Sequence, residues 1–254
     1  LTIHVRLPEK TLGERSTLFQ GFAEASSITA VSHAIQLEIE KVAPSMATKV
    51  STLYFGLQEA PLAPADLNFD GPTILCVGRL VAEKGFDVAI EAFARLREQY
   101  PGIRLEIAGD GPERTNLEAQ ATSLSVSDGV EFLGWVDPQK VPALMNTATI
   151  VVVPSRWREA LGLVAIQAAQ MGRPVVASRQ SGLVEAVIDG ETGILVPKDR
   201  PDILAESVAD LLMNPERTRT MGRRARADAL ERFCFDRFVS EQYDLYRRIL
   251  TTPG

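Results

Sequence analysis

From residue 72 onward, short apolar runs rich in β-branched residues alternate with amphipathic stretches. Residues 86–99 and 201–213 carry apolar side chains at helical spacing, so each predicts a helix with one buried face. Strand–helix alternation of this kind predicts an α/β fold with a parallel, doubly wound sheet and right-handed crossovers. The predicted strands span residues 73–77, 104–108, 130–133, 150–153, 174–177 and 193–196.

The first part of the chain predicts a smaller β-α-β unit with its own sheet. We expect strands at 1–5, 27–31 and 50–55 and a helix over 32–42. The chain starts with Leu1 rather than Met, inside a predicted strand. This start favours a fragment or a trimmed product, and the first sheet is expected to be incomplete.

These patterns divide the chain into four segments. We expect a first unit at 1–56, a linker rich in Pro and Ala at 57–71, a main domain at 72–234, and a C-terminal helix within 235–254. The final helix has four apolar residues at core-like spacing and is expected to pack on one of the two sheets. These residues are Phe238, Tyr243, Tyr246 and Ile249.

Composition excludes several classes of protein. A hydrophobic fraction of 45% supports a buried core, and a net charge of -6 argues against a nucleic-acid partner. Cys76 and Cys234 lack the spacing of a disulfide framework or a zinc site. No apolar run has the length of a membrane span, and no signal peptide is visible. The expected compartment is a reducing cytoplasm.

The segment GRLVAEKG, from Gly78 to Gly85, follows an apolar strand and opens a helix. Ligands of open α/β sheets bind at such strand ends. Gly78 permits a close turn, while Arg79 and Lys84 supply cations beside free backbone amides, which predicts a diphosphate site. The alternative is a surface turn with solvated charges. The dinucleotide motif Gly-x-Gly-x-x-Gly is absent, and the glycines of Gly109-Asp110-Gly111 are interpreted as a structural turn.

A second strand-to-helix loop, from Pro154 to Gly172, is acidic. Glu159 stands at the loop end, and Gly162, Leu163 and Val164 would offer amides at the first helical turn. Gln167 lies on nearly the same helical face, roughly 12 Å further along. The two side chains could therefore address opposite ends of an extended ligand such as a sugar nucleotide.

Both side chains also have simpler interpretations. Glu159 could be a solvated carboxylate stabilised by the helix dipole, and Gln167 a polar residue at the edge of a buried helix. Trp157 could cover the ligand, although packing beneath the loop is the preferred expectation.

In this order the pieces resemble family 4 of the retaining glycosyltransferases, which belong to the glycosyl transferases of group 1. The resemblance implies a GT-B type fold, with two Rossmann-like domains facing across a cleft and the nucleotide sugar bound mainly by the second. This chain would then hold the second domain and a remnant of the first, acceptor-side domain, with the C-terminal helix crossing back to that remnant. The segments that carry the resemblance are ILCVGRLVAEKGFDVAIEAF, LEIAGDGPER, VEFLGWV, VVVPSRWREALGLVAIQAAQMGRPVVAS, SGLVEAVIDGETGILVP and FDRFVSEQYDLYRRIL.

The resemblance also implies residue roles around the donor. Arg79 and Lys84 would bind the diphosphate, and Glu159 with the amides of Leu161 to Val164 would contact the sugar and phosphates. Val136 would lie near the base through its backbone.

Four residues near this implied site are also compared with the family. His4 resembles a cleft histidine near the sugar. Gln167 replaces a glutamate that binds the ribose in the family, and Ala160-Leu161 replaces a common Gly-Phe. A positive φ at Ala160 would be costly, because only glycine adopts it readily.

The implied reaction moves a sugar from a UDP or GDP sugar to a hydroxyl of a saccharide, lipid or other small acceptor, with retention of anomeric configuration. No metal or cofactor is expected, and no Asp-x-Asp motif is present. The alternative is a donor-binding module that is inactive without a further N-terminal segment, which could also carry a peripheral membrane contact. An epimerase or dehydrogenase is disfavoured, since neither its glycine motif nor a Tyr-x-x-x-Lys motif occurs.

Overall fold

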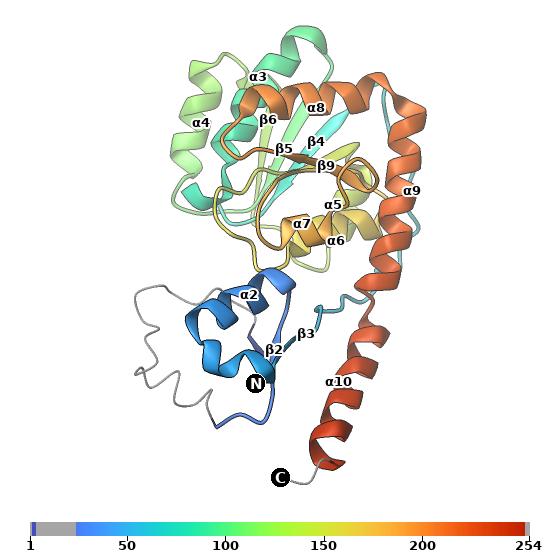
Figure 1. The fold of residues 1–254 in the computed structure, drawn as a ribbon. Helices are drawn as coiled ribbons and strands as arrows, with labels where there is room; N and C mark the ends of the chain where they lie inside the picture. Colours follow the sequence, from blue (N-terminus) through green and yellow to red (C-terminus); the bar gives the residue numbers. More distant parts are fainter. Residues whose placement is uncertain (1, 4–23, 252–254) are drawn as a thin grey trace.

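The computed structural model describes residues 2–3 and 24–251 and contains two parallel sheets (Figure 1). The small sheet has the order β1-β2-β3. It consists of β1 (Thr2–Ile3), β2 (Ile28–Ala30) and β3 (Val50–Thr52). With its helix α2 (His33–Val42) and the 3-10 turn η1 (Pro44–Lys49), it forms what we term the small unit. His4 lies outside the described residues.

The large sheet has six parallel strands in the order β6-β5-β4-β7-β8-β9. The chain therefore adds strands on one side of β4 and then returns to add strands on the other side. The α/β, doubly wound prediction is confirmed, and the switch point lies between β4 and β7, where such sheets bind ligands. The strands are β4 (Thr73–Val77), β5 (Arg104–Ala108), β6 (Val130–Gly134), β7 (Ile150–Val153), β8 (Val175–Ser178) and β9 (Gly193–Val196).

Helices cover both faces of the large sheet, and together with it form what we term the large unit (Figure 1). Side chains alternate across each strand: on β4, Leu75 enters one apolar cluster, whereas Ile74 and Cys76 enter the other. One face packs on α3 (Phe86–Gln99), α4 (Arg114–Ser123) and α8 (Pro201–Met213); the other packs on α5 (Val141–Thr147), α6 (Leu163–Gln170), α7 (Leu183–Ala186) and α9 (Pro215–Arg232). Two further 3-10 turns are η2 (Ala82–Lys84) and η3 (Ser127–Gly129).

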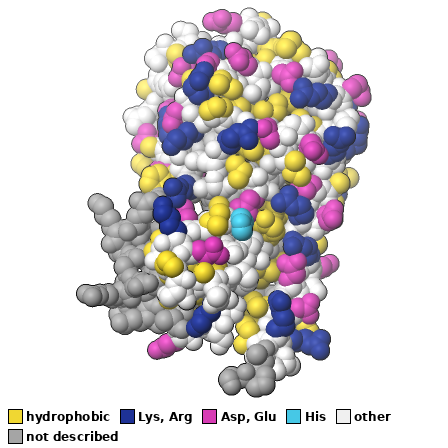
Figure 2. All heavy atoms as spheres, in the orientation of Figure 1, with side chains coloured by type: hydrophobic (Ala, Val, Ile, Leu, Met, Phe, Trp, Pro, Cys, Tyr) yellow, Lys and Arg dark blue, Asp and Glu magenta, His cyan; other side chains and the backbone are white. Residues whose placement is uncertain are grey.

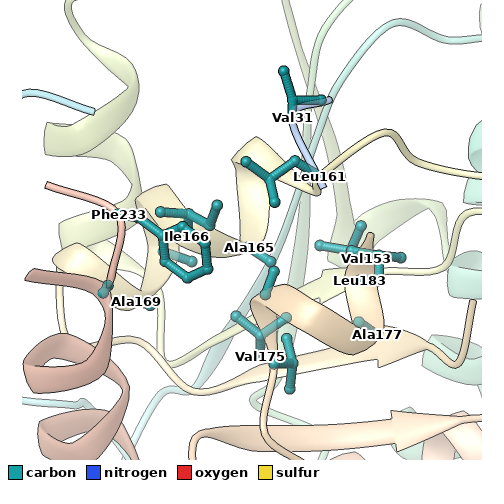
Figure 3. Packing of buried hydrophobic residues seen from close by; sticks show 14 of the residues in the cluster. Val31, Val153, Leu161, Ala165, Ile166, Ala169, Val175, Ala177, Leu183 and Phe233 are labelled. Carbon is teal, nitrogen blue, oxygen red and sulfur yellow. The ribbon is translucent and has the colours of Figure 1, made fainter. Parts of the chain in front are cut away.

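One apolar cluster continues from the large unit into the small one. It joins Ile35 and Ile39 of α2 with Leu161 and Phe233. Figure 3 shows Val31 of the small unit beside Leu161 at the upper end of this packing. The two sheets thus share a hydrophobic core.

The segment expected to be a linker is held firmly against the large unit. Arg173 is only 1% exposed, and its guanidinium donates to the carbonyls of Met171, Ala148 and Ala65 and to the side chain of Asn146. Burial lowers the pKa of Arg173 to about 10. Because these acceptors include the backbone of residue 65, the segment has little freedom to swing.

The C-terminal helix α10 (Phe235–Thr251) leaves the large unit and runs past the small one (Figure 1). Phe238 contacts the ring of Phe55, with ring centroids 5.3 Å apart. However, Tyr243 and Tyr246 are 62% and 56% exposed, so the expected core packing is wrong for these two residues. Core-like spacing does not supply a partner surface, and the described residues leave this face uncovered. None of the helices in the described part of the chain is long and apolar enough to cross a membrane.

Candidate functional site

A cavity of about 310 Å³ opens at the carboxyl ends of β4 and β7, at the switch point of the large sheet. Its wall includes residues of both units. Val31 and Phe55 come from the small unit and the residue stretch beyond it, while Lys84, Ser155 and Glu159 supply polar groups from the large unit. Much of the remaining wall is apolar.

Lys84 and Glu159, predicted from separate loops, meet in this cavity. Lys84 Nζ lies 2.6 Å from Glu159 Oε1, and the Ser155 hydroxyl donates to the same oxygen at 2.6 Å. Both partners of the ion pair are largely buried, although each keeps a surface open to solvent. Arg79 is exposed and makes no ion pair or side-chain hydrogen bond with any described residue. Its guanidinium lies outside the cavity wall.

The Gly78 loop is shaped by the neighbouring Gly109 turn. Gly78 and Leu80 donate backbone hydrogen bonds to Ala108 and Asp110, each at 2.9 Å. A Cβ on Gly109 would overlap the carbonyl oxygen of Gly78, so only glycine permits this approach. The structure gives the Gly109-Asp110-Gly111 turn the packing role expected of it.

The N-terminus of α6 lies in the cavity wall and has open amides. Gly162 is the N-cap with φ 87°, and no side chain caps the helix. The amides of residues 161–164 make no hydrogen bond with any residue that the structure describes. Ala160 is absent from the residues with positive φ, so its replacement of glycine strains nothing here. The left-handed position falls on Gly162 instead.

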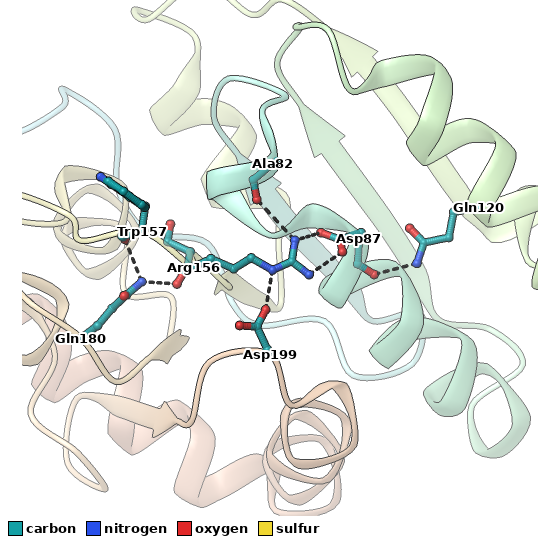
Figure 4. A network of polar contacts seen from close by, with 8 residues as sticks. Ala82, Asp87, Gln120, Arg156, Trp157, Gln180 and Asp199 are labelled. Atoms are coloured by element: carbon teal, nitrogen blue, oxygen red, sulfur yellow. Dashed lines mark hydrogen bonds and ion pairs between the residues drawn. The ribbon is translucent and has the colours of Figure 1, made fainter.

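Arg156 is a positioning residue that the sequence analysis missed (Figure 4). Its guanidinium donates twice to the Asp87 carboxylate, at 2.6 and 2.5 Å, and also hydrogen-bonds Asp199. These contacts raise the pKa of Arg156. Its backbone amide donates to the Glu83 carbonyl at 2.8 Å. Arg156 thereby links the Glu159 loop to the turn that carries Lys84. The position of Arg156 in the sequence does not indicate that Asp87 and Asp199 are its partners.

The remaining predicted residues lie away from the cavity wall. Gln167 is half-buried, and its side chain hydrogen-bonds none of the described residues. Val136 packs against the shared apolar cluster. Trp157 is 55% exposed, so the expectation that it packs beneath the loop is wrong. The Gln180 side chain binds the Trp157 carbonyl and holds the loop from its other side.

Residues 62–228 match the family profile "Glycosyl transferases group 1". The chain belongs to this family. The match covers nearly all of the large unit and most of the stretch before it, including both loops of the cavity.

Much of this chain is similar to curated glycosyltransferases. It is 37% identical over 168 residues to a GDP-mannose-dependent alpha-(1-6)-phosphatidylinositol monomannoside mannosyltransferase of Mycolicibacterium smegmatis, covering 64% of this chain and 44% of that protein. It is 35% identical over 206 residues to a glycogen synthase of Mycobacterium tuberculosis, covering 80% of this chain and 49% of that protein. The chain thus spans about half the length of the curated relatives it matches.

Solved structures share the GT-B type arrangement. Anabaena Alr3699/HepE in complex with UDP-glucose has a TM-score of 0.85 at 23% identity, covering 97% of this chain and 71% of that one. Sucrose-phosphate synthase from Thermosynechococcus elongatus has a TM-score of 0.81 at 26% identity, covering 98% and 67%. These similarities extend over both units.

Proposed function

We propose that this chain carries the donor site of a cytoplasmic glycosyltransferase that moves a sugar from a nucleoside-diphosphate sugar to an acceptor hydroxyl. The observation that carries the proposal is the ion pair of Lys84 and Glu159 at the switch point, beside the uncapped N-terminus of α6. A cation and free amides suit a diphosphate, and a carboxylate suits sugar hydroxyls.

The chemistry follows from where charge develops. Cleavage of the bond between the anomeric carbon and the diphosphate oxygen leaves negative charge on the leaving group. Lys84, the α6 amides and the exposed Arg79 would stabilise that charge, and each such contact is worth about 3 kcal/mol in the barrier. We propose a metal-independent reaction, because these cations supply the neutralisation.

Retention is the proposed stereochemical outcome. The acceptor oxygen forms a bond to the anomeric carbon on the face that the diphosphate leaves, and its proton passes to a leaving-group oxygen. Glu159 would orient the sugar. The acceptor is a saccharide, lipid or other small molecule. Among the relatives, one is named for GDP-mannose and one structure contains UDP-glucose.

A donor-binding module without transfer activity is the second candidate. It is favoured by the coverage, since the chain spans about half of the curated relatives. In this candidate, the small unit is a remnant of the acceptor-side domain and α10 crosses back to it. Such a module would bind the nucleotide sugar yet leave it intact.

Calorimetric titration with UDP, GDP and ADP tests the donor site. We expect saturable binding of one nucleotide, weakened about tenfold or more by Lys84→Ala and by Arg79→Ala. Arg95→Ala is the matched control, because Arg95 is exposed on α3 and pairs only with Glu91 among the described residues. If no nucleotide binds, or if all three substitutions act alike, the proposed site is wrong.

The nucleotide that binds identifies the base of the nucleotide sugars to test. Proton NMR of the sugar released by slow donor hydrolysis reports the anomeric configuration first formed. Retention is expected, with a rate unchanged by a chelator. Inversion or loss of activity with the chelator would contradict the proposed mechanism, whereas binding without turnover would support the module.

A further inference from the structure

A carboxylate of the large unit receives three hydrogen bonds from the small unit and the residues just beyond it. Glu185 Oε2 accepts from the His33 amide at 2.7 Å and from the Tyr54 hydroxyl at 3.0 Å, while Oε1 accepts from the Ala34 amide at 2.8 Å. We call this set of four residues the Glu185 clamp.

The clamp completes the N-terminus of α2. Ser32 is the N-cap of this helix, and its hydroxyl accepts only from the Ile35 amide among the described groups. The first turn of α2 holds no acidic residue. Glu185 therefore supplies both the missing acceptors for His33 and Ala34 and the negative charge that a helix N-terminus favours.

The helix that carries Glu185 is seated on the Glu159 loop. The Gly182 amide, directly before α7, donates to the Glu159 carbonyl at 3.0 Å. A Cβ on Gly182 would lie 2.5 Å from Leu161 Cα, which shows how closely the two segments approach. A shift of the Glu159 loop is thereby transmitted to α7.

The other side of the clamp adjoins the cavity. Val31 directly precedes the N-cap of α2, and Phe55 directly follows Tyr54. Both line the cavity that contains Lys84 and Glu159. The donors held by Glu185 are thus chain neighbours of the two side chains that close the cavity from this side.

Covalent connections alone leave the angle between the units open. The chain passes between them at residues 53–72 and again near Phe233, and these passages are joined by the Leu57 amide, which donates to the Phe233 carbonyl at 2.8 Å. Noncovalent contacts must therefore fix the angle between the two units. Besides the shared core, contacts between the described residues include the clamp, the edge contact of the Tyr54 ring with Phe233 at 5.4 Å, and an ion pair of Arg158 with Glu38 at 2.6 Å.

We infer that Glu185 is a positioning residue, which holds Val31 and Phe55 over the sugar end of the donor site by clamping the start of α2 and Tyr54. The inference rests on the proposed donor site. Glu185 itself touches no reacting atom, and it acts through the placement of the two cavity walls relative to one another.

Hydrogen exchange on the whole chain tests the clamp without any ligand. Glu185→Ala and the size-conserving Glu185→Gln are expected to speed exchange of the His33 and Ala34 amides about tenfold, because a hydrogen bond to a charged acceptor is lost or weakened. Glu191→Gln, an exposed glutamate in the turn after α7, is the matched control. Unchanged exchange in both Glu185 variants would overturn the clamp.

Ligand titration tests the positioning role. In Glu185→Gln we expect the affinity for the bare nucleotide to change less than twofold and that for the nucleotide sugar to fall about fivefold, because Val31 and Phe55 line the same cavity as Glu159, which orients the sugar in the proposed donor site. Equal losses for both ligands, or no loss for the sugar, would overturn it. If the unaltered protein binds neither ligand, the proposed function fails, while the exchange result still decides the clamp.

Discussion

Glu106 on β5 lies opposite Glu131 on β6 in the register of the large sheet. Burial, and after it the neighbouring Glu131 carboxylate, raise the pKa of Glu106, whereas Arg104 opposes them. A carboxyl group with a raised pKa in the folded state costs no stability while it is protonated in both states. It costs stability once the pH exceeds its pKa in the unfolded chain.

Replacing Glu106 should therefore have a pH-dependent effect. Relative to the unaltered protein, Glu106→Gln is expected to gain free energy of unfolding as the pH rises from about 4 to about 7, with no gain at the acidic end. Urea unfolding at several pH values measures this. Glu98→Gln, at an exposed position on α3, should show no such trend. A gain that grows toward acidic pH would contradict the assignment.

Ala160 and Gln167 both depart from the residues common in the family, and the two departures have different structural consequences. Ala160 stands where glycine is common, yet its φ is not positive, so the loop tolerates it. Gln167 keeps a hydrogen-bonding group without the charge of the usual glutamate. In the proposed donor site its replacement would affect ribose binding, and the fold does not depend on it through a side-chain hydrogen bond to any described residue.

At the scale of elements, two loops depend on one another. The Gly78 loop and the Gly109 turn follow adjacent parallel strands, β4 and β5, and they approach too closely for any side chain at Gly109. The loop that carries Lys84 is braced in turn by Gly85, whose φ is 68°. A Cβ there would overlap the Pro154 carbonyl oxygen.

Two glycine-to-alanine substitutions should distinguish the cost of crowding the backbone from the ordinary effect of replacing a glycine. Gly109→Ala is expected to lower the free energy of unfolding by about 3 kcal/mol, because the Cβ must displace backbone. Gly102→Ala is the control, since no atom lies within 4 Å of its Cβ and its φ is ordinary. Thermal or urea unfolding compares them. If both substitutions change the free energy of unfolding equally, the two loops can move apart at little cost and the predicted crowding is wrong.

Several elements whose signal is local were predicted to the residue, and others to within one residue at either end. The strand 73–77 and the helix 86–99 were predicted at their observed bounds, because an apolar run or a helical repeat decides them. The strand expected at 50–55 ends at Thr52. The apolar residues after Thr52 belong to the connection between the two units instead. Within it, the Leu53 amide still donates one hydrogen bond to the Ala30 carbonyl.

The site was predicted in its parts but not in its contacts. The family resemblance assigned Lys84 and Glu159 to one ligand, and each follows a strand of a parallel sheet, where ligands bind. Their ion pair depends on the adjacency of β4 and β7, which the order of strands along the chain does not state. Arg156 and Glu185 were missed because their partners lie far away in sequence.

At the scale of the whole molecule, charge is spread rather than concentrated. Figure 2 shows Lys and Arg interspersed with Asp and Glu over the face in view. Many charges in the described part of the chain are paired, as in the ion pair of Arg217 with Asp210 at 2.6 Å. The face in view therefore presents no basic stripe of the kind that a nucleic acid requires.

The shared hydrophobic core predicts that the two sheets unfold cooperatively. Ile39 on α2 is fully buried in the cluster that reaches Leu161 and Phe233, whereas Leu37 on the same helix is 51% exposed.

Trp135 and Trp157 both lie in the large unit, so tryptophan fluorescence reports unfolding there. Ile39→Ala is expected to lower the free energy of unfolding seen by fluorescence by about 3 kcal/mol, although the mutation lies in the other unit. Leu37→Ala should change it little. If Ile39→Ala leaves the fluorescence transition in place and adds a separate one seen only by circular dichroism, the units unfold independently, and the core between them is too weak to couple α2 to the donor cavity.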